Sequence, residues 1–327
     1  MKTKSVFCEK CREYTTFKVK EQETVHKLKD TDVEFVEKVA TCSSCGCEVY
    51  VDELNDANLE NIYARYRKIN NIISLEKIKQ IPEMYNIGKR PLSLILGWGE
   101  QTFTRYFDGY IPSQMYSKIL KNIYEDPYAF LTILEENKGQ ISKVAYEKSR
   151  KATECLLYRD SISIDAVANY ILCQCNDITP LALQKALYYA QGFYFALFNA
   201  FLLKENCEAW AHGPVYRCVY NTYSNYKYDA IDTVVPVDTT LFTPNQKLIL
   251  DCVVKYFCCY SGKVLEDFTR KETPWSKTRG NLPDIAASKK VIKKTLICEY
   301  FKNVKKKYYM LTPNDISAYA VDMFQSR

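Results

Sequence analysis

Two pairs of cysteines near the start of the chain have the spacing of metal-binding knuckles. Cys8 and Cys11 form one Cys-x-x-Cys pair, and Cys42 and Cys45 form a second pair after a gap of 30 residues. Four thiolates make the closed tetrahedral set that a structural zinc ion prefers. We therefore predict one bound Zn²⁺ per chain, with no coordination position left for a catalytic water.

Two alternatives at this site stay open in the sequence. Cys47 follows Cys45 closely and could replace it as a ligand, or the thiols could be separate core residues. His26 lies among charged residues between the two pairs, so we expect it on the surface. A ribbon of about 50 residues buries little surface, and zinc would supply the missing stability, roughly 10–16 kcal/mol in zinc-finger peptides.

A second candidate site is the stretch RPLSLILGWGEQTFTRYFDGYIP, residues 90–112. Its apolar pattern predicts helices over 91–96 and 100–107, with Gly97 in the turn between them. In a helix-turn-helix the second helix enters the major groove of DNA. The predicted contacts to phosphates and bases are Lys89, Arg90, Gln101, Thr102, Thr104 and Arg105.

One of only two histidines, His212, stands in EAWAHGPVYRCVY, residues 208–220. A catalytic histidine needs an orienting acid together with a nucleophile or a path for water. The neighbouring residues are Glu208 and aromatics, which favour a structural corner or a surface pocket. Catalysis, metal binding and pH switching are the alternatives.

Contacts to a protein partner need aromatic or arginine anchors, and the candidates beside this corner are Tyr216 and Arg217. Trp210 and Trp275 are expected in the core. Lysines recur from residue 289 to 307 at helical spacing, which predicts a positive helix face. A solvated face is the simplest interpretation, and contact with an acidic partner or with RNA is the alternative.

The composition of the whole chain indicates the kind of protein in which these residues are placed. Its 327 residues are 47% hydrophobic and 26% charged, with a formal net charge of +6, as in ordinary soluble proteins. The start has no signal-peptide run, so we expect a cytoplasmic location and nine reduced core cysteines after Cys47. Residues 186–203 carry no charge, but Gln191 and Asn199 interrupt them, which favours a buried helix over a membrane span.

Alternation of apolar residues at Phe17 and Val19, and then at Val33 and Phe35, predicts strands in the first part. In the second half, helix starts are predicted at Thr179-Pro180, Thr243-Pro244 and Thr312-Pro313. We therefore predict a multidomain, mainly α protein with a small N-terminal β zinc ribbon. The expected parts are the ribbon (1–54), a helical helix-turn-helix domain (55–137), a linker or solvated helix (138–158) and a helical C-terminal domain (159–327).

The second candidate site resembles a known motif. GWGEQTFTRYFDGYIPS is similar to the Xre-type helix-turn-helix through Thr102, Arg105, Tyr106, Gly109 and Pro112. With the cysteine ribbon before it, the first 137 residues resemble the MqsA-type antitoxins. That resemblance implies a toxin-facing zinc module, operator DNA as a partner and a homodimer.

The second half resembles another family. ALQKALYYAQGFYFAL, EAWAHGPVYRCVYNTY and KETPW occur in the order found in the Panacea domain of SocA-like and GepA-like proteins of phages and bacteria. The resemblance covers about residues 160–305. It implies a mainly helical domain that neutralises toxins in two-gene modules, a role related to phage defence, without enzymatic activity.

From these patterns we expect a type II antitoxin. It would bind a toxin from an adjacent gene through its C-terminal domain and repress its own promoter through the helix-turn-helix. The alternative is a zinc-ribbon transcriptional regulator whose C-terminal domain senses a ligand or partner. A zinc-dependent hydrolase is a weaker alternative, because four cysteine ligands leave no open position on the metal.

Overall fold

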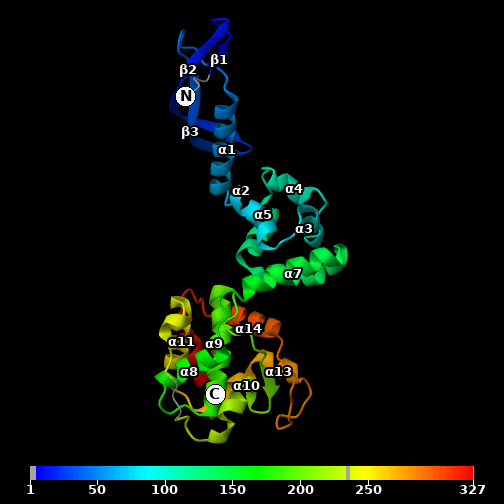
Figure 1. Ribbon diagram of the computed structural model, residues 1–327, viewed down its shortest axis with the longest axis vertical. Coiled ribbons are helices and arrows are strands. Elements are labelled where there is room, and N and C mark those ends of the chain that lie inside the picture. Colours follow the sequence, from blue (N-terminus) through cyan, green and yellow to red (C-terminus); the bar gives the residue numbers. More distant parts are fainter. Residues whose placement is uncertain (1–4, 233–235, 327) are drawn as a thin grey trace. The chain divides into compact units, whose positions relative to one another are not determined.

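A computed structural model describes residues 5–232 and 236–326 of the chain. The chain divides into two compact units, Met1–Thr153 and Glu154–Arg327. The described residues are mainly helical, with a small antiparallel sheet in the first unit and a two-stranded ribbon in the second (Figure 1).

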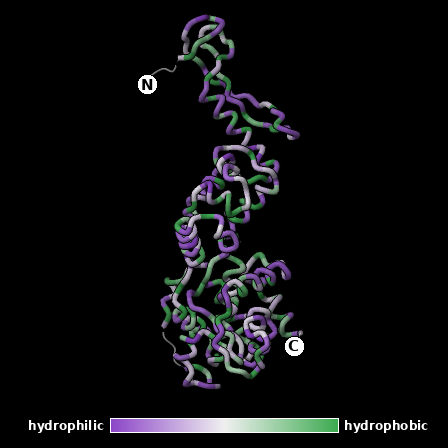
Figure 2. The backbone as a smooth tube through the Cα atoms, turned by 90° about the vertical axis from the view of Figure 1, so that its right-hand side faces the viewer, coloured by the Kyte–Doolittle hydropathy of each residue, from purple (hydrophilic) through white to green (hydrophobic). Residues whose placement is uncertain are grey.

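The first unit begins with the predicted ribbon. Its antiparallel strands are β1 (Ser5–Cys8), β2 (Glu13–Leu28) and β3 (Thr31–Cys42), in the order β1-β2-β3. β2 and β3 pair from Phe17 opposite Cys42 to Leu28 opposite Thr31, so most of the gap between the cysteine pairs is one long hairpin. Figure 2 shows both hydrophilic and hydrophobic residues along this hairpin.

α1 (Asp52–Ile69) covers the outer edge of β3. Asn58 accepts a hydrogen bond from the backbone N–H of Lys38 and donates one to its carbonyl, both at 2.9 Å. Asn61 and Arg65 donate to carbonyls further along the strand. The helix thereby satisfies backbone groups that an open strand edge would leave unpaired.

The rest of the first unit consists of short helices. They are α2 (Leu75–Met84), α3 (Lys89–Ile95), α4 (Thr102–Phe107), α5 (Gln114–Glu125), α6 (Pro127–Glu136) and the 3-10 turn η1 (Lys138–Gln140). Ile78, Phe103, Leu120 and Phe130 are among their fully buried side chains. α7 (Lys143–Leu157) follows, so the expected linker is helical over most of its length and contains the boundary between the units.

α9 (Pro180–Phe198) is the central helix of the second unit, and most of its residues are buried. The other elements are α8 (Ile164–Gln174), β4 (Glu208–Trp210), β5 (Gly213–Val215), α10 (Arg217–Tyr223), η2 (Ser224–Tyr226), η3 (Thr239–Leu241), α11 (Pro244–Tyr256), α12 (Gly262–Lys271), α13 (Thr273–Arg279), α14 (Lys294–Lys307), η4 (Pro313–Asp315) and α15 (Ile316–Gln325). Contacts to α9 come from helices α8, α10, α11, α12 and α14 and from strand β5.

The uncharged run 186–203 lies largely in α9 and is buried, as predicted for a core helix. No helix among the described residues is both long and apolar enough to cross a membrane. The threonine-proline starts are also confirmed. Thr179 caps α9, Thr243 forms a capping box with Gln246 in α11, and Thr312 caps η4, which leads into α15.

The nine later cysteines correct one expectation. Cys207, Cys252 and Cys298 are buried, as expected for core thiols. Four others are exposed: Cys155, Cys173 and Cys218 lie in the first or last turn of a helix, and Cys259 lies in the turn between α11 and α12. The prediction of core positions was therefore wrong for these four.

Candidate functional site

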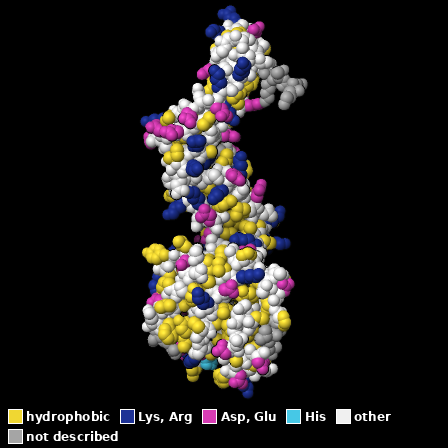
Figure 3. All heavy atoms as spheres, turned by 90° about the vertical axis from the view of Figure 1, so that its left-hand side faces the viewer, with side chains coloured by type: hydrophobic (Ala, Val, Ile, Leu, Met, Phe, Trp, Pro, Cys, Tyr) yellow, Lys and Arg dark blue, Asp and Glu magenta, His cyan; other side chains and the backbone are white. Residues whose placement is uncertain are grey.

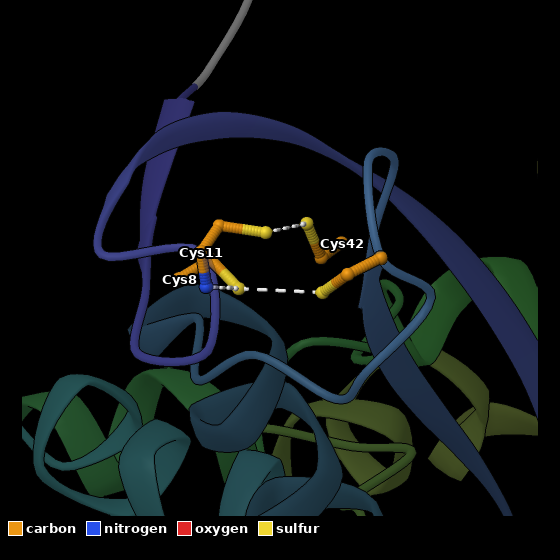
Figure 4. A group of neighbouring side chains, drawn as sticks. Cys8, Cys11 and Cys42 are labelled. Carbon is orange, nitrogen blue, oxygen red and sulfur yellow. Dashed lines mark hydrogen bonds between the residues drawn. The ribbon is translucent and has the colours of Figure 1, made fainter.

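The four predicted zinc ligands lie together in the ribbon. The sulfur atoms of Cys8, Cys11, Cys42 and Cys45 are all within 4.8 Å of one another. Sγ of Cys8 is 3.6 Å from Sγ of Cys45, and Sγ of Cys11 is 4.0 Å from Sγ of Cys42 (Figure 4). Tetrahedral Zn–S bonds of about 2.3 Å place the sulfur atoms about 3.8 Å apart, so the cluster has the size of a zinc site.

Local backbone geometry holds these thiols in place. Cys8 ends β1 and Cys42 ends β3, and each begins a tight turn closed by a backbone hydrogen bond to its own carbonyl. The N–H of Cys11 donates to Sγ of Cys8, and the N–H of Ser44 donates to Sγ of Cys42, both at 3.4 Å. The hydrogen bond from Ser44 favours the thiolate of Cys42, which is the form that binds a metal.

The surroundings of Cys42 favour loss of its proton. The hydroxyl of Thr15 lies 3.2 Å from Sγ of Cys42 and, with nearby backbone N–H groups, lowers the pKa of this thiol to about 6. The donor set is all sulfur, gathered in advance and closed, which fits a structural zinc ion. His26 is exposed in β2, opposite Val33, as expected for a surface residue.

The predicted helix-turn-helix segment forms two short helices with different bounds. α3 begins at Lys89 instead of residue 91, and α4 begins at Thr102 instead of residue 100, because Gln101 is the N-cap of α4. Gly97 has a φ of +71° in the turn between them, a left-handed conformation that favours glycine. The N–H of Phe103 donates to the Ser93 hydroxyl and ties the helices together.

The six predicted DNA contacts differ in exposure. Gln101 and Arg105 are exposed, whereas Thr102 and Thr104 are half-buried, so only the first two project freely from α4. A helix that reads DNA needs exposed polar side chains near its N-terminus. Gln101, the N-cap of α4, meets that requirement, whereas Arg105 is exposed in the last turn of the helix.

The two predicted phosphate contacts are ion-paired. Lys89 lies 3.5 Å from Asp108, and Arg90 lies 2.8 Å from Glu100. Exposed pairs of this kind contribute about 0–1 kcal/mol. A DNA phosphate would therefore displace these carboxylates at small cost.

In the second unit, polar side chains of α9 fix the corner formed by β4 and β5. Oε1 of Gln184 accepts from the N–H of Tyr216 at 2.7 Å, and its Nε2 donates to the carbonyl of Tyr216 at 3.3 Å. Nζ of Lys185 donates to the carbonyl of Pro214 at 3.0 Å. Complete burial lowers the pKa of Lys185 to about 7. These buried polar residues serve to hold the backbone of the corner.

His212 occupies the turn between β4 and β5, with a side chain that is 73% exposed. Its Nδ1 lies 3.2 Å from Oε1 of Glu266, which also lies 3.0 Å from Nζ of Lys263 and 3.5 Å from the guanidinium of Arg270. Burial opposes ionisation of Glu266, but Lys263 and His212 hold its pKa below the ordinary value. A carboxylate shared by three basic groups anchors the turn, which favours the structural interpretation of His212.

Beside the turn is a half-exposed cluster that we call the Trp210 surface, formed by Trp210, Arg217 and Tyr220. Trp210 and Arg217 both donate to Oε2 of Glu208 at 2.8 Å. The rings of Trp210 and Tyr220 meet edge-on with centroids 4.8 Å apart. Trp210 is thus only half-buried, which corrects its expected core position, because it ends β4 and its ring packs against the exposed Tyr220.

The two predicted partner contacts differ. Tyr216 is 1% exposed because Gln184 fixes its backbone and its ring lies in the core, so it is corrected from a surface candidate to a core residue. The side chain of Arg217 is 45% exposed. Tyr220 was not among the predicted contacts; it is 40% exposed, and its i+3 spacing from Arg217 places both on one helix face. Trp275 is buried, as expected.

The lysine run is not a single solvated face. Nζ of Lys294 donates to the carbonyls of Leu203 and Lys204, and partial burial lowers the pKa of Lys294 to about 8. Lys307 pairs with Asp322 at 3.2 Å. The expected uniform positive face is therefore interrupted by contacts that sequence periodicity does not reveal.

The corner formed by β4 and β5 lies in a part of the chain that matches a known protein family. Residues 183–276 match the family described as "Antitoxin SocA-like, Panacea domain". No curated protein and no solved structure matches the chain. The matched stretch contains the contacts of Lys185 with β5, the turn at His212 and the Trp210 surface. Residues 183–276 therefore form an antitoxin-like Panacea domain.

Proposed function

We propose that this protein is the antitoxin of a type II toxin–antitoxin module and neutralises a co-encoded toxin by direct binding. The observation that carries the proposal is the match of residues 183–276 to the antitoxin SocA-like Panacea domain. This stretch lies within the compact unit Glu154–Arg327, which has its own hydrophobic core. We assign neutralisation to that unit.

The Trp210 surface is the proposed toxin contact. Trp, Tyr and Arg are the residue types that dominate binding hot spots. Trp210 and Arg217 are held by hydrogen bonds to Glu208, and Tyr220 is held by its ring contact with Trp210. These contacts restrict the side chains before a partner binds, which reduces the entropy lost on binding. Hydrophobic side chains are also exposed on this unit in the face drawn in Figure 3.

Neutralisation is proposed to need no catalysis. The carboxylate beside His212 is shared with Lys263 and Arg270, and the buried amine of Lys185 is engaged with a backbone carbonyl. Both titratable groups therefore serve the shape of the corner. Neutralisation by binding requires only that the corner presents a fixed surface to the toxin.

In the first unit we propose a structural zinc ion held by the four cysteines and an operator-binding role for α3 and α4. The zinc would cross-link the strands of the ribbon, and the exposed side chains of Gln101 and Arg105 would contact bases. Binding to the operator of its own promoter as a homodimer would give autorepression.

The test uses the gene adjacent to the one that encodes this protein. Its product should arrest growth when expressed alone and be tolerated when the full chain is co-expressed. Purified full chain should form a stable complex with that product. A neighbour that is harmless alone, together with a C-terminal unit that binds a small ligand, would support the regulator instead.

A further inference from the structure

The cysteine cluster contains a fifth thiol. Sγ of Cys47 lies 3.0 Å from Sγ of Cys45 and 3.4 Å from Sγ of Cys8. A tetrahedral zinc ion takes four ligands, with sulfur atoms about 3.8 Å apart. The contact between Cys45 and Cys47 is too short for both to bind one ion, so one of these two thiols lies outside the coordination shell.

The distances identify Cys45 as the resident ligand. Cys45 belongs to the group of four sulfur atoms that are all within 4.8 Å of one another. Cys47 touches only one side of that group, at Cys8 and Cys45. In this position its S–H can donate to a bound thiolate, so it supports a ligand from outside the shell.

The backbone keeps Cys47 at the site independently of Cys45. The carbonyl of Cys47 accepts from the N–H of Cys42 at 2.8 Å, and Glu48 forms a β-bridge with Thr41. Residue 47 is therefore attached to the end of β3, whereas Cys45 lies within the turn. Bringing Cys47 onto the metal requires a side-chain rotation and little ordering of the chain.

We propose that Cys47 is a reserve zinc ligand that replaces Cys45 when the Cys45 thiolate is lost. The inference rests on the proposed zinc site. It predicts that the ribbon tolerates loss of Cys45, which is half-exposed like Cys11, but not loss of a buried ligand such as Cys42. The site would then keep four sulfur ligands after substitution of Cys45.

The test uses full-length protein loaded with Co²⁺, whose thiolate charge-transfer absorption increases with the number of bound thiolates. Wild type, Cys47→Ser and Cys45→Ser are expected to show four-thiolate spectra. Cys42→Ser and the double variant Cys45→Ser/Cys47→Ser should show three. Zinc release to a colorimetric chelator should be at least about ten-fold faster from the double variant than from Cys45→Ser.

A three-thiolate spectrum or no bound metal in Cys45→Ser, with four thiolates in wild type, would overturn the reserve role and leave the zinc site standing. A three-thiolate spectrum in Cys47→Ser would overturn the assignment of Cys45 as resident ligand. Wild-type protein that binds no cobalt or zinc would overturn both the zinc site and the inference.

Discussion

Lys185 packs directly against Gly213. A Cβ placed on Gly213 would lie 2.9 Å from Cε and 3.0 Å from Nζ of Lys185, and 2.7 Å from Oγ1 of Thr269. Gly213 also has a φ of +92°, which side-chain-bearing residues rarely adopt. The buried amine reaches the carbonyl of Pro214 because residue 213 has no side chain.

Gly213→Ala is therefore expected to destabilise the second unit by about 2–4 kcal/mol, from backbone strain and overpacking together. Urea unfolding followed by tryptophan fluorescence measures this, in a Trp98→Phe background where Trp210 and Trp275 report on the second unit. In a Thr269→Ala background the cost should fall by about 1 kcal/mol, because the closest clash is removed. An equal cost in both backgrounds would show that this contact is not responsible.

Glu272 carries a pH-dependent contribution to stability. Its Oε1 accepts from the hydroxyls of Tyr189 at 2.8 Å and Tyr319 at 2.6 Å. Burial raises the pKa of Glu272 from 4.5 to about 7, although these hydrogen bonds act in the opposite direction. Burial also raises the pKa of the surrounding tyrosines, so they stay neutral in this range.

The folded chain thus holds this proton more tightly than the unfolded chain. The stability from Glu272 is fully present below about pH 4.5 and is lost as the pH rises through about 7, a change of roughly 3 kcal/mol. In Glu272→Gln this loss of stability with rising pH should disappear. Lys185, whose lowered pKa makes the stability rise at higher pH, contributes equally in both proteins. Urea unfolding of both proteins between about pH 5 and pH 8 checks this. Parallel profiles would contradict the assignment.

Zinc removal should unfold the ribbon alone. The ribbon has a small core, so loss of the ion should increase amide exchange across β1, β2 and β3 while α9 stays protected. Wild-type protein should contain one equivalent of zinc and Cys8→Ser well under half of that. Cys259→Ser, which changes an exposed thiol of the other unit, is the control and should keep its metal. Equal zinc content in all three proteins would refute the site.

Operator binding should depend on α4. Arg105→Ala should weaken binding to the promoter fragment by about 1–3 kcal/mol, because a bidentate base contact is lost. Arg90→Ala should lower affinity for all sequences and reduce the salt dependence by about one ion, as expected for a phosphate contact. Lys79→Ala, an exposed substitution in α2, is the control. Unchanged affinity in both Gln101→Ala and Arg105→Ala would exclude α4 as the reading helix.

Local signals were predictable from the sequence. The clustering of Cys8, Cys11, Cys42 and Cys45 followed from knuckle spacing, and the helix starts at Thr179 and Thr243 followed from capping chemistry. Both depend on residues a few positions apart or on a metal's fixed geometry. Such features need no knowledge of the tertiary fold.

Features set by distant contacts were not predictable. Tyr216 is buried because Gln184, 32 residues earlier, binds its backbone on both sides. Lys294 leaves the expected solvated face because its amine reaches carbonyls about 90 residues away in the chain. The periodicity of apolar residues indicates the type of a single helix or strand and does not indicate which residues of other elements contact it.

We expect the second unit to neutralise the toxin through the Trp210 surface. The most direct test is rescue of growth in cells that express the toxin, paired with a pull-down, for residues 154–327 and for full-length Arg217→Ala/Tyr220→Ala. Tyr309→Ala, at a tyrosine that is 87% exposed elsewhere on the unit, is the control. The fragment and the control should rescue and bind, and the double variant should lose at least about 2 kcal/mol of affinity and fail to rescue. A folded fragment that neither rescues nor binds, while the full chain does both, would contradict the claim and place the toxin contact in the zinc ribbon.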